Sequence, residues 1–260
     1  RARLIPHQEF GRKRDSSDGF ESVDLSEDGR DLPRHVAVIM DGNGRWATMR
    51  EKSRAEGHSR GAEVLRDLVR WSQERGLAEL TCYALSTENF QQRPSDEVDS
   101  LLNLLGTYLK SEREELDRLQ VCFRVIGRTA ELPEETQVLL QETVDLTRQN
   151  DNLVLRLAVN YGGRAELEDA ARLLRSSPEV TSLAQCLYEP EMSDVDLLIR
   201  SGGEKRFSNF LPWQLTYSEL YFTPVLWPDF SEKEFDLALG EYSSRSRRFG
   251  RLPNREAEAE

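Results

Sequence analysis

The fold is decided by the stretch HVAVIMDGNGRW at residues 35–46. Its first half, residues 35–40, is apolar on both faces, as a strand buried in a parallel sheet is. The second half becomes polar at once, because Asp41 follows the apolar run, two glycines flank Asn43, and Arg45 comes next. In open α/β sheets ligands bind at the carboxyl ends of strands, so this stretch predicts both a central strand and a site at its end.

Five further apolar runs of strand length follow along the chain, at residues 80–85, 121–126, 153–159, 195–199 and 220–225. Helical patterns lie between them or after them, at residues 61–75, 95–119, 133–149, 164–175 and 232–247. This alternation predicts an α/β fold, a single domain with a central, mainly parallel sheet of about six strands flanked by helices.

The chain ends differ from this central part. Residues 1–33 are polar and rich in turn formers, which predicts a flexible N-terminal extension. Residues 253–260 are expected to be an acidic disordered tail. Residues 34–252 would then form the folded domain.

Composition excludes several classes of protein. The 260 residues carry 35 Lys and Arg against 47 Asp and Glu, a net charge of −12, which makes non-specific binding to nucleic acid unfavourable. Charges interrupt every apolar run, so no stretch is long enough for a transmembrane helix. The 3 cysteines are far apart in the sequence, which argues against a disulfide framework or a zinc site. A cytoplasmic location is expected.

Asp41 and its neighbours have the chemistry of a metal-diphosphate site. An aspartate binds Mg²⁺, glycines let backbone N–H groups approach phosphate oxygens, and Arg45 adds a forked donor. Taken alone, the same residues fit an ordinary tight turn with a capping Asp equally well.

Two other strand ends carry similar groups. Between the first and second strands lie Arg54 and His58, which are four residues apart and would therefore share one face of a helix. The second strand leads into Ser86 and on to Arg93, and the fifth ends in RSGGEKRFSNF at residues 200–210. Basic, hydroxyl and glycine residues at three strand ends of an acidic protein favour a site for several phosphates over three unrelated turns.

These segments together resemble the cis-prenyltransferase family over roughly residues 34–250. The stretch at residues 35–47 is similar to the first signature of that family. Further matches in the same order are Arg54 with Gly57 and His58, Ser86 with Glu88 and Asn89, residues 160–164, residues 200–210, Trp213, Gln214, Tyr217, residues 219–222 and residues 227–230. Several independent blocks make the resemblance specific.

The resemblance implies an Mg²⁺-dependent transferase. It would condense isopentenyl diphosphate onto an allylic diphosphate primer, expected to be farnesyl diphosphate, with cis double-bond formation. The product would be a polyprenyl diphosphate, an undecaprenyl-like precursor of a carrier lipid. The resemblance also implies a homodimer, in which residues 248–250 reach the partner's site, and a transient membrane contact through the product.

The resemblance also carries over site residues. Asp41 would be catalytic and bind Mg²⁺, Asn89 would assist proton removal, and Glu219 would be the second carboxylate associated with the metal. The substrate-binding residues would be Gly42, Asn43, Gly44, Arg45, Trp46, Arg54, His58, Ser86, Thr87, Glu88, Phe90, Arg93, Arg200, Arg206, Phe207 and Ser208.

The sequence departs from the family pattern at a few positions. Phe90 stands where Trp is usual, Lys205 replaces a common His, and residues 89–94 include one extra residue that bears on the role of Arg93. Ala84, just before a polar strand end, leaves room for a long product. Leucines at residues 80–85 and 101–109 would line an apolar tunnel or simply form core.

Two other functions stay open at this point. A haloacid-dehalogenase-like phosphatase also begins with an Asp after a first strand, but it needs an acid two positions later, where this chain has Asn43. The other alternative is a catalytically inactive accessory subunit of a heteromeric prenyltransferase. Such subunits lack the metal-binding Asp and several arginines, whereas Asp41, Arg45, Arg200 and Arg206 are present.

Overall fold

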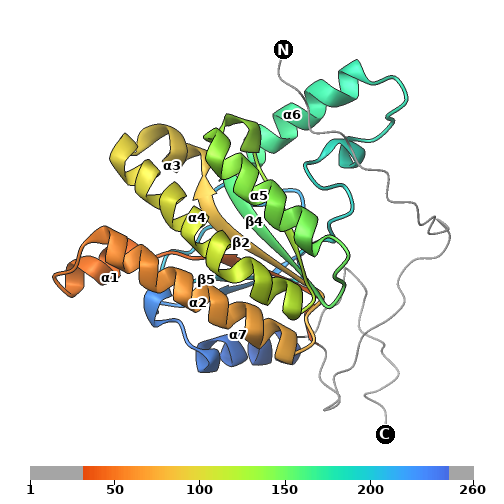
Figure 1. Ribbon diagram of the computed structural model, residues 1–260. Helices are drawn as coiled ribbons and strands as arrows, with labels where there is room; N and C mark the ends of the chain where they lie inside the picture. The colour runs from red at the N-terminus through yellow and green to blue at the C-terminus, as the bar shows by residue number, and fades with distance from the viewer. Residues whose placement is uncertain (1–31, 246–260) are drawn as a thin grey trace, which may run out of the picture.

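The computed structural model describes residues 32–245, and Figure 1 shows a sheet with helices packed around it. Residues 1–31 of the predicted extension, the predicted tail and the segment at residues 248–250 lie outside the described residues; Leu32 and Pro33, the last two residues of the predicted extension, pack against the fold. The strands are β1 (His35–Ile39), β2 (Glu79–Ser86), β3 (Val121–Ile126), β4 (Leu153–Tyr161), β5 (Leu197–Arg200) and β6 (Glu219–Phe222). The helices are α1 (Asn43–Met49), α2 (Arg54–Glu74), α3 (Thr87–Gln92), α4 (Ser95–Arg118), α5 (Glu134–Thr147), α6 (Gly163–Ser176) and α7 (Glu232–Ser244), with short 3₁₀ turns at Thr129–Glu131, Leu183–Cys186 and Trp227–Asp229.

All five strand pairings in the six-stranded sheet are parallel, in the order β3-β4-β2-β1-β5-β6. The predicted α/β fold is therefore confirmed. β1 and β2 lie in the middle of the sheet, and the carboxyl ends of all six strands point to the same edge.

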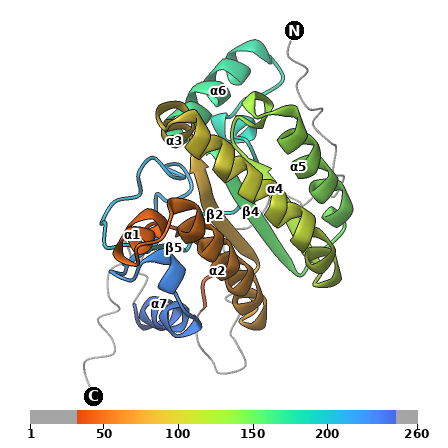
Figure 2. The same ribbon diagram turned by 60° about the vertical axis from the view of Figure 1, so that its left-hand side comes forward.

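The central strand β1 is buried on both sides. Its alternate residues Val36 and Val38 belong to one apolar cluster, while Ala37 and Ile39 belong to the other. Because side chains alternate along a strand, both faces of the sheet must be covered. α2, α4, α5 and α7 contribute to the first cluster, and the irregular segments at residues 188–195 and 210–215 contribute to the second. Figure 2 shows α2, α4 and α5 side by side over one face of the sheet.

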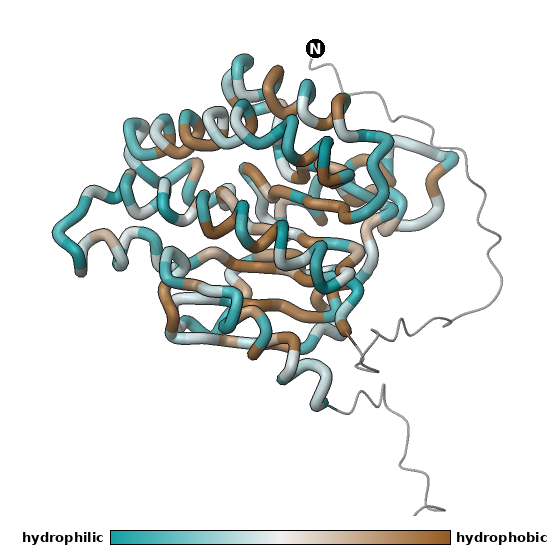
Figure 3. Tube along the Cα trace, turned by 60° about the horizontal axis from the view of Figure 1, so that its bottom comes forward, coloured by the Kyte–Doolittle hydropathy of each residue, from teal (hydrophilic) through white to brown (hydrophobic). Residues whose placement is uncertain are grey.

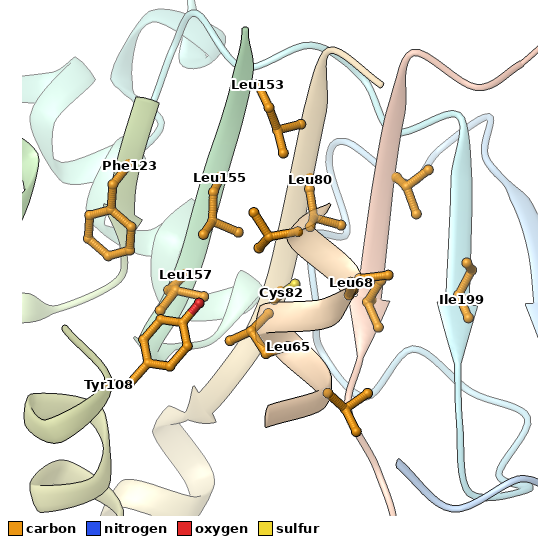
Figure 4. Close-up of a cluster of buried hydrophobic side chains, with 14 of the residues drawn as sticks. Leu65, Leu68, Leu80, Cys82, Tyr108, Phe123, Leu153, Leu155, Leu157 and Ile199 are labelled. Carbon is orange, nitrogen blue, oxygen red and sulfur yellow. The ribbon is translucent and has the colours of Figure 1, made fainter. Parts of the chain in front are cut away.

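Hydropathy along the chain follows this layering. Figure 3 shows the strands at the centre as mostly apolar, while the outer helices alternate between apolar and polar residues. On α2 and α4 the apolar residues recur every three or four positions, so each helix buries one stripe against the sheet. The largest cluster contains Leu68, Leu80, Leu109, Phe123 and Leu155, each with 0% of its surface exposed; several of these appear in Figure 4.

Several boundaries differ from the prediction, the start of α2 and the end of β6 among them. α2 begins at Arg54 rather than at residue 61, because Ser53 and Glu56 form a capping box at its start. Gly57 and Gly61 weaken the helical pattern, but they are needed for packing. A Cβ at Gly57 would lie 2.3 Å from the carbonyl oxygen of Asn43. The last strand, β6, ends at Phe222, three residues before the predicted end at residue 225.

Candidate active site

A cavity of about 690 Å³ opens at the carboxyl edge of the sheet. It lies between the sheet, α2 and α4. Its polar lining residues are Asp41, Asn43, His58, Ser86, Glu88, Asn89, Arg93, Arg200, Ser208 and Asn209, and its deeper lining is mostly leucine, from α2, α4 and the strands. The cavity therefore has a charged mouth and an apolar interior.

Asp41 lies where the charged groups of the mouth converge. Its carboxylate accepts a hydrogen bond from Arg200 at 2.9 Å and pairs with Arg45 at 3.3 Å. Its backbone N–H donates to the hydroxyl of Ser201 at 3.0 Å, which fixes the chain as it leaves β1. Gly202, at φ +84°, makes room for this arrangement, because a Cβ there would lie 2.5 Å from the Arg45 guanidinium.

Arg200 ends β5 and is buried, with 4% of its surface exposed. One guanidinium nitrogen donates to the hydroxyl of Ser208 at 2.7 Å and to the carbonyl of Arg206. Its Nε lacks a hydrogen-bond partner within residues 32–245. Such an orphaned donor beside a cavity is unfavourable unless an acceptor fills it, so Arg200 is ready for an anionic ligand.

The loop that holds Arg200 is strained. Ser208, Asn209 and Leu211 have φ values of +48°, +61° and +45°, in the left-handed region that such residues seldom adopt. Backbone strain of this kind persists where surrounding contacts enforce it, and it clusters at binding sites. Here Asn209 is tied to α3 by a 2.8 Å bond from its amide to Glu88.

A second basic cluster faces the first across the mouth. Arg54 and Arg93 both bond to Glu97, at 3.0 Å and 2.7 Å. His58 lies beside them, and burial together with the charge of Arg93 lowers its pKa to about 4. His58 is therefore a neutral imidazole at pH 7. A single carboxylate thus holds two arginines at the edge of the cavity.

The end of β2 carries the remaining polar groups. Ser86 caps α3, because its hydroxyl accepts the backbone N–H of Asn89 at 3.0 Å. This cap places Asn89 and Glu88 on the first turn of α3, and both line the cavity.

Nine of the predicted residues line the cavity: Asp41, Asn43, His58, Ser86, Glu88, Asn89, Arg93, Arg200 and Ser208. Arg45 and Arg54 stand at its rim through the contacts given above. Gly42 and Gly44 contribute by leaving room for their neighbours. A Cβ at Gly44 would lie 3.1 Å from Nε of Arg54, and one at Gly42 would contact Leu226.

The structure does not bring the other predicted residues into the cavity. Trp46 donates its indole N–H to Asp229 at 2.7 Å, and Phe90 lines a separate hollow next to Leu132. Thr87 is buried against Gly162. Two residues of the 200–210 loop face solvent outside the cavity lining, Arg206, whose side chain pairs with Glu204, and Phe207.

Glu219 does not meet Asp41 within one chain. β1 and β5 align Val36 with Leu197, and β5 and β6 align Leu197 with Glu219. Glu219 therefore lies at the amino edge of the sheet, opposite Asp41, and pairs there with Arg245 at 2.7 Å. The prediction of a metal site that joins these two carboxylates is not met by the described residues of a single chain.

The residues at Asp41 nevertheless fit Mg²⁺. The described chain holds no group of three or more His, Cys, Asp or Glu side chains suited to a metal. Mg²⁺ in phosphate-transferring sites is usually held by one or two carboxylates together with substrate phosphates and water. Asp41, with 31% of its side chain exposed at a mouth lined by arginines, supplies one such carboxylate.

Sequence reasoning missed several contributors. Ser201 and Glu97 position the charged groups. Glu97 lies in the first turn of α4, whereas Arg93 precedes that helix on the other side of Pro94, so no spacing within one helix indicates this ion pair. Leu157 of β4 also lines the cavity, as do Tyr83 and Tyr108, which fall within the two segments predicted to form either tunnel or core. No sequence signal separates those three from ordinary core residues.

Comparison with known proteins agrees with this geometry. Residues 39–250 match the family model described as putative undecaprenyl diphosphate synthase. The chain is 45% identical over 229 residues to the isoprenyl transferase of Fusobacterium nucleatum, covering 86% of this chain and 99% of the relative. It is 46% identical over 231 residues to the isoprenyl transferase of Thermotoga maritima, with the same coverage of 86% and 99%.

Solved structures are similar as well. One is lavandulyl diphosphate synthase from Lavandula x intermedia in complex with dimethylallyl diphosphate, with a TM-score of 0.80 and 36% identity over 84% of this chain and 98% of that one. Another is a probable undecaprenyl diphosphate synthase from Campylobacter jejuni, with a TM-score of 0.72 and 33% identity over 84% and 98%.

The fold and the site therefore define an enzyme of the prenyltransferase class. More particularly, the chain belongs to the isoprenyl transferase family of undecaprenyl diphosphate synthase and its relatives, the cis-prenyltransferases, whose members elongate prenyl chains.

Proposed function

We propose that this enzyme condenses isopentenyl diphosphate with an allylic diphosphate, farnesyl diphosphate or a close relative, in an Mg²⁺-dependent reaction that forms a cis double bond. The observation that carries the proposal is the convergence of two basic clusters on the mouth of a cavity that becomes apolar inside. Two diphosphates need two sets of cations, and a growing hydrocarbon needs a dry interior.

Each basic cluster suits one substrate. Arg54, His58 and Arg93 surround the end of the cavity nearest α2 and α4, which suits the allylic diphosphate with its hydrocarbon directed inward. Arg200 and Ser208, with the orphaned Nε of Arg200, suit isopentenyl diphosphate. The structure of lavandulyl diphosphate synthase with dimethylallyl diphosphate is that of a relative that binds an allylic diphosphate, which supports an allylic diphosphate as one of the two substrates.

The reaction breaks the bond between the allylic carbon and its diphosphate oxygen. A carbon–carbon bond forms to the terminal alkene carbon of isopentenyl diphosphate, and one proton leaves. Arginines at the mouth stabilise the negative charge that develops on the leaving group. The cation would neutralise part of this charge when bound, and Asp41 would hold it.

Asn89 lies in the lining of the cavity, beside Glu88. A neutral amide is too weak a base to take the proton itself, so its role in proton removal is to orient the groups that exchange the proton. The released diphosphate is the nearest strong acceptor in such a site.

A homodimer is also proposed. Trp213, Tyr217 and Leu220 expose 41%, 73% and 39% of their surfaces on neighbouring parts of the chain. Exposed apolar groups gathered in this way mark association surfaces. Glu219 and Arg245 lie beside them, so the carboxylate that does not reach Asp41 within its own chain lies at the surface offered to a second copy.

The product that we propose is a polyprenyl diphosphate. A polyprenyl diphosphate would be apolar enough for transient contact with a membrane, while the proposed location is the cytoplasm. None of the helices in residues 32–245 combines the length and the apolarity needed to cross a membrane.

One assay separates the proposal from its alternatives. The purified chain is incubated with farnesyl diphosphate, radiolabelled isopentenyl diphosphate and Mg²⁺, and the products are separated by length and examined by NMR. The proposal predicts labelled prenyl products with new cis double bonds. A phosphatase would release inorganic phosphate without elongation, and an accessory subunit would show no turnover alone.

A further inference from the structure

One residue of the strained loop holds together elements that are far apart in the sequence. Asn209 follows Ser208 in the loop and lines the cavity with it. The amide nitrogen of its side chain donates to the carboxylate of Glu88 on α3 at 2.8 Å. The amide oxygen accepts the backbone N–H of Arg164 at 2.9 Å, and the backbone carbonyl of Asn209 accepts that of Gly163 at 2.8 Å. Asn209 therefore joins the loop both to α3 and to the first turn of α6.

The start of α6 depends on this contact. Gly162, the residue before the helix, has no side chain to cap it, and the first N–H groups of a helix have no partner within the helix. Asn209 supplies the missing acceptors from 45 residues away in the sequence. Its side-chain oxygen takes the place of an N-cap oxygen, a role in which Asn and Asp are both effective. The cap fixes where the loop lies relative to the end of β4.

The surrounding chain leaves room for Asn209. A Cβ at Gly162 would lie 3.0 Å from its Nδ2, and one at Gly163 would lie 3.1 Å from its carbonyl oxygen. Its φ of +61° is left-handed, a conformation that Asn adopts more readily than most residues. The next residue, Phe210, is fully buried and stacks on Tyr83 of β2, with 4.4 Å between the ring centroids. The loop is thus anchored on both sides of the bond to α3.

We propose that Asn209 is a positioning residue of the reaction, which holds the loop that carries Ser208 in register with the first turn of α3. Ser208 belongs to the cluster assigned to isopentenyl diphosphate, whereas α3 leads directly into Arg93 of the other cluster. The alkene carbon and the allylic carbon must meet for a bond to form, and a misplacement of about 1 Å costs on the order of 10²-fold in rate. This inference rests on the proposed function, since it assumes two substrates in one mouth.

The test exchanges the donor and the acceptor of the bond between Asn209 and Glu88. Asn209→Asp keeps an oxygen that caps α6 but removes the donor, and it brings two carboxylates to hydrogen-bond distance, where like charges repel. Glu88→Gln alone keeps an oxygen that accepts from Asn209. The double variant restores the hydrogen bond in the reverse direction, because the new amide at position 88 donates to the new carboxylate at position 209.

The parent, the two single variants and the double variant form a double-mutant cycle. Each is assayed with isopentenyl diphosphate varied at saturating farnesyl diphosphate and Mg²⁺. Asn209→Asp is expected to lower kcat/KM about tenfold or more in the parent, but by less than about threefold in the Glu88→Gln background. Any chemical role of Glu88 itself is lost in both proteins that carry Glu88→Gln, so it cancels from this comparison. The melting temperature should change little, because the cap on α6 is kept.

Two control variants separate positioning from charge and from folding. Asn152→Asp adds the same negative charge just before β4, at the amino edge of the sheet, and should match the parent. Asn209→Gly keeps the left-handed backbone but removes both side-chain bonds, so it should lower the rate in both backgrounds without rescue. If Asn209→Asp does not fold, Asn209→Gly becomes the deciding variant.

The outcomes separate the two levels of the proposal. If the parent chain makes no prenyl product at all, the proposed function fails. The inference alone is overturned if the parent elongates and the folded deciding variant keeps kcat/KM within about threefold of the parent, the range of ordinary surface substitutions. It is also overturned if Asn209→Asp is as damaging in the Glu88→Gln background as in the parent.

Discussion

Two arginines of the central sheet are almost equally buried but are held in different ways. Arg156 on β4 has 3% of its surface exposed and donates to the carboxylates of Glu79 and Glu189 at 2.6 Å and 2.9 Å. Arg200 on β5 has 4% exposed and has the single carboxylate partner Asp41, while its Nε is left unpaired among the described residues.

The difference separates a structural charge from one prepared for a ligand. The network around Arg156 includes Ser193 and His35, which both contact the carboxylate of Glu79. The carboxylate of Glu189 accepts from Arg156 itself. Burial opposes ionisation of Glu79, but the charge of Arg156 and the hydrogen bonds from Arg156 and Ser193 hold its pKa below the usual value. Around Arg200, in contrast, the backbone is strained and a donor is free. A buried arginine indicates a binding site only when its hydrogen bonds are incomplete.

The largest expected effect is a loss of stability when Arg156 is replaced. Arg156→Met leaves the carboxylate of Glu79 buried without its cation, so the free energy of unfolding should fall by about 3–5 kcal/mol. Chemical denaturation of the variant and the parent enzyme measures the change. Adding Glu79→Gln removes the uncompensated charge and should restore part of the loss; a single variant as stable as the parent would show that the network is not needed.

The next largest effect is a weaker use of one substrate when an arginine of one basic cluster is removed. Arg200→Ala should weaken the use of isopentenyl diphosphate by roughly 1.5–3 kcal/mol, because one charge-assisted contact is lost, with little change in melting temperature. Arg54→Ala should weaken primer use instead. Steady-state kinetics with each substrate varied in turn decides this, and equal effects of both variants on both KM values would refute the assignment of one cluster per diphosphate.

The smallest effect concerns pH. The pKa of His58 is about 4 in the folded enzyme and about 6.5 in an unfolded chain. Between these values the unfolded state binds more protons, so stability is full above pH 6.5 and falls as the pH drops. The loss attributable to His58 between pH 7 and pH 5 is on the order of 2 kcal/mol.

Urea unfolding of the parent and His58→Gln at both pH values measures this loss. Other groups, such as His35, titrate in both proteins, so the difference between them isolates His58. The variant should lose less stability than the parent on acidification. Parallel losses would show that His58 is not held neutral by burial.

The fold could be predicted because its signal is periodic and local. The apolar runs are buried on both faces, as at β1, and such runs separated by helical patterns leave few arrangements other than a parallel sheet. The start of α2 was predicted wrongly because Gly57 and Gly61 have low helix propensity. Their value lies in the close approach of α1, a contact that is absent from a local pattern.

The site could be predicted in part for the same reason. Asp41, Ser86 and Arg200 follow strands directly, and parallel strands bring their carboxyl ends together. Glu97 and Tyr108 could not be found in this way, since their roles depend on which face of α4 meets the cavity. Glu219 begins β6, at the opposite edge of the sheet from Asp41, so a strand-end pattern does not indicate its role.

Asp41 lies at the centre of the first basic cluster, since it contacts Arg45 and Arg200 directly. Asp41→Ala is therefore the most direct test of the account, with the initial rate of isopentenyl diphosphate incorporation measured at saturating Mg²⁺ and the melting temperature measured in parallel. Loss of such a charge-stabilising group is expected to lower the rate by about 10²–10³-fold or more, with the fold intact because the side chain faces the cavity. A folded variant that retains a rate within about threefold of the parent, the range of ordinary surface substitutions, would contradict the central role of Asp41.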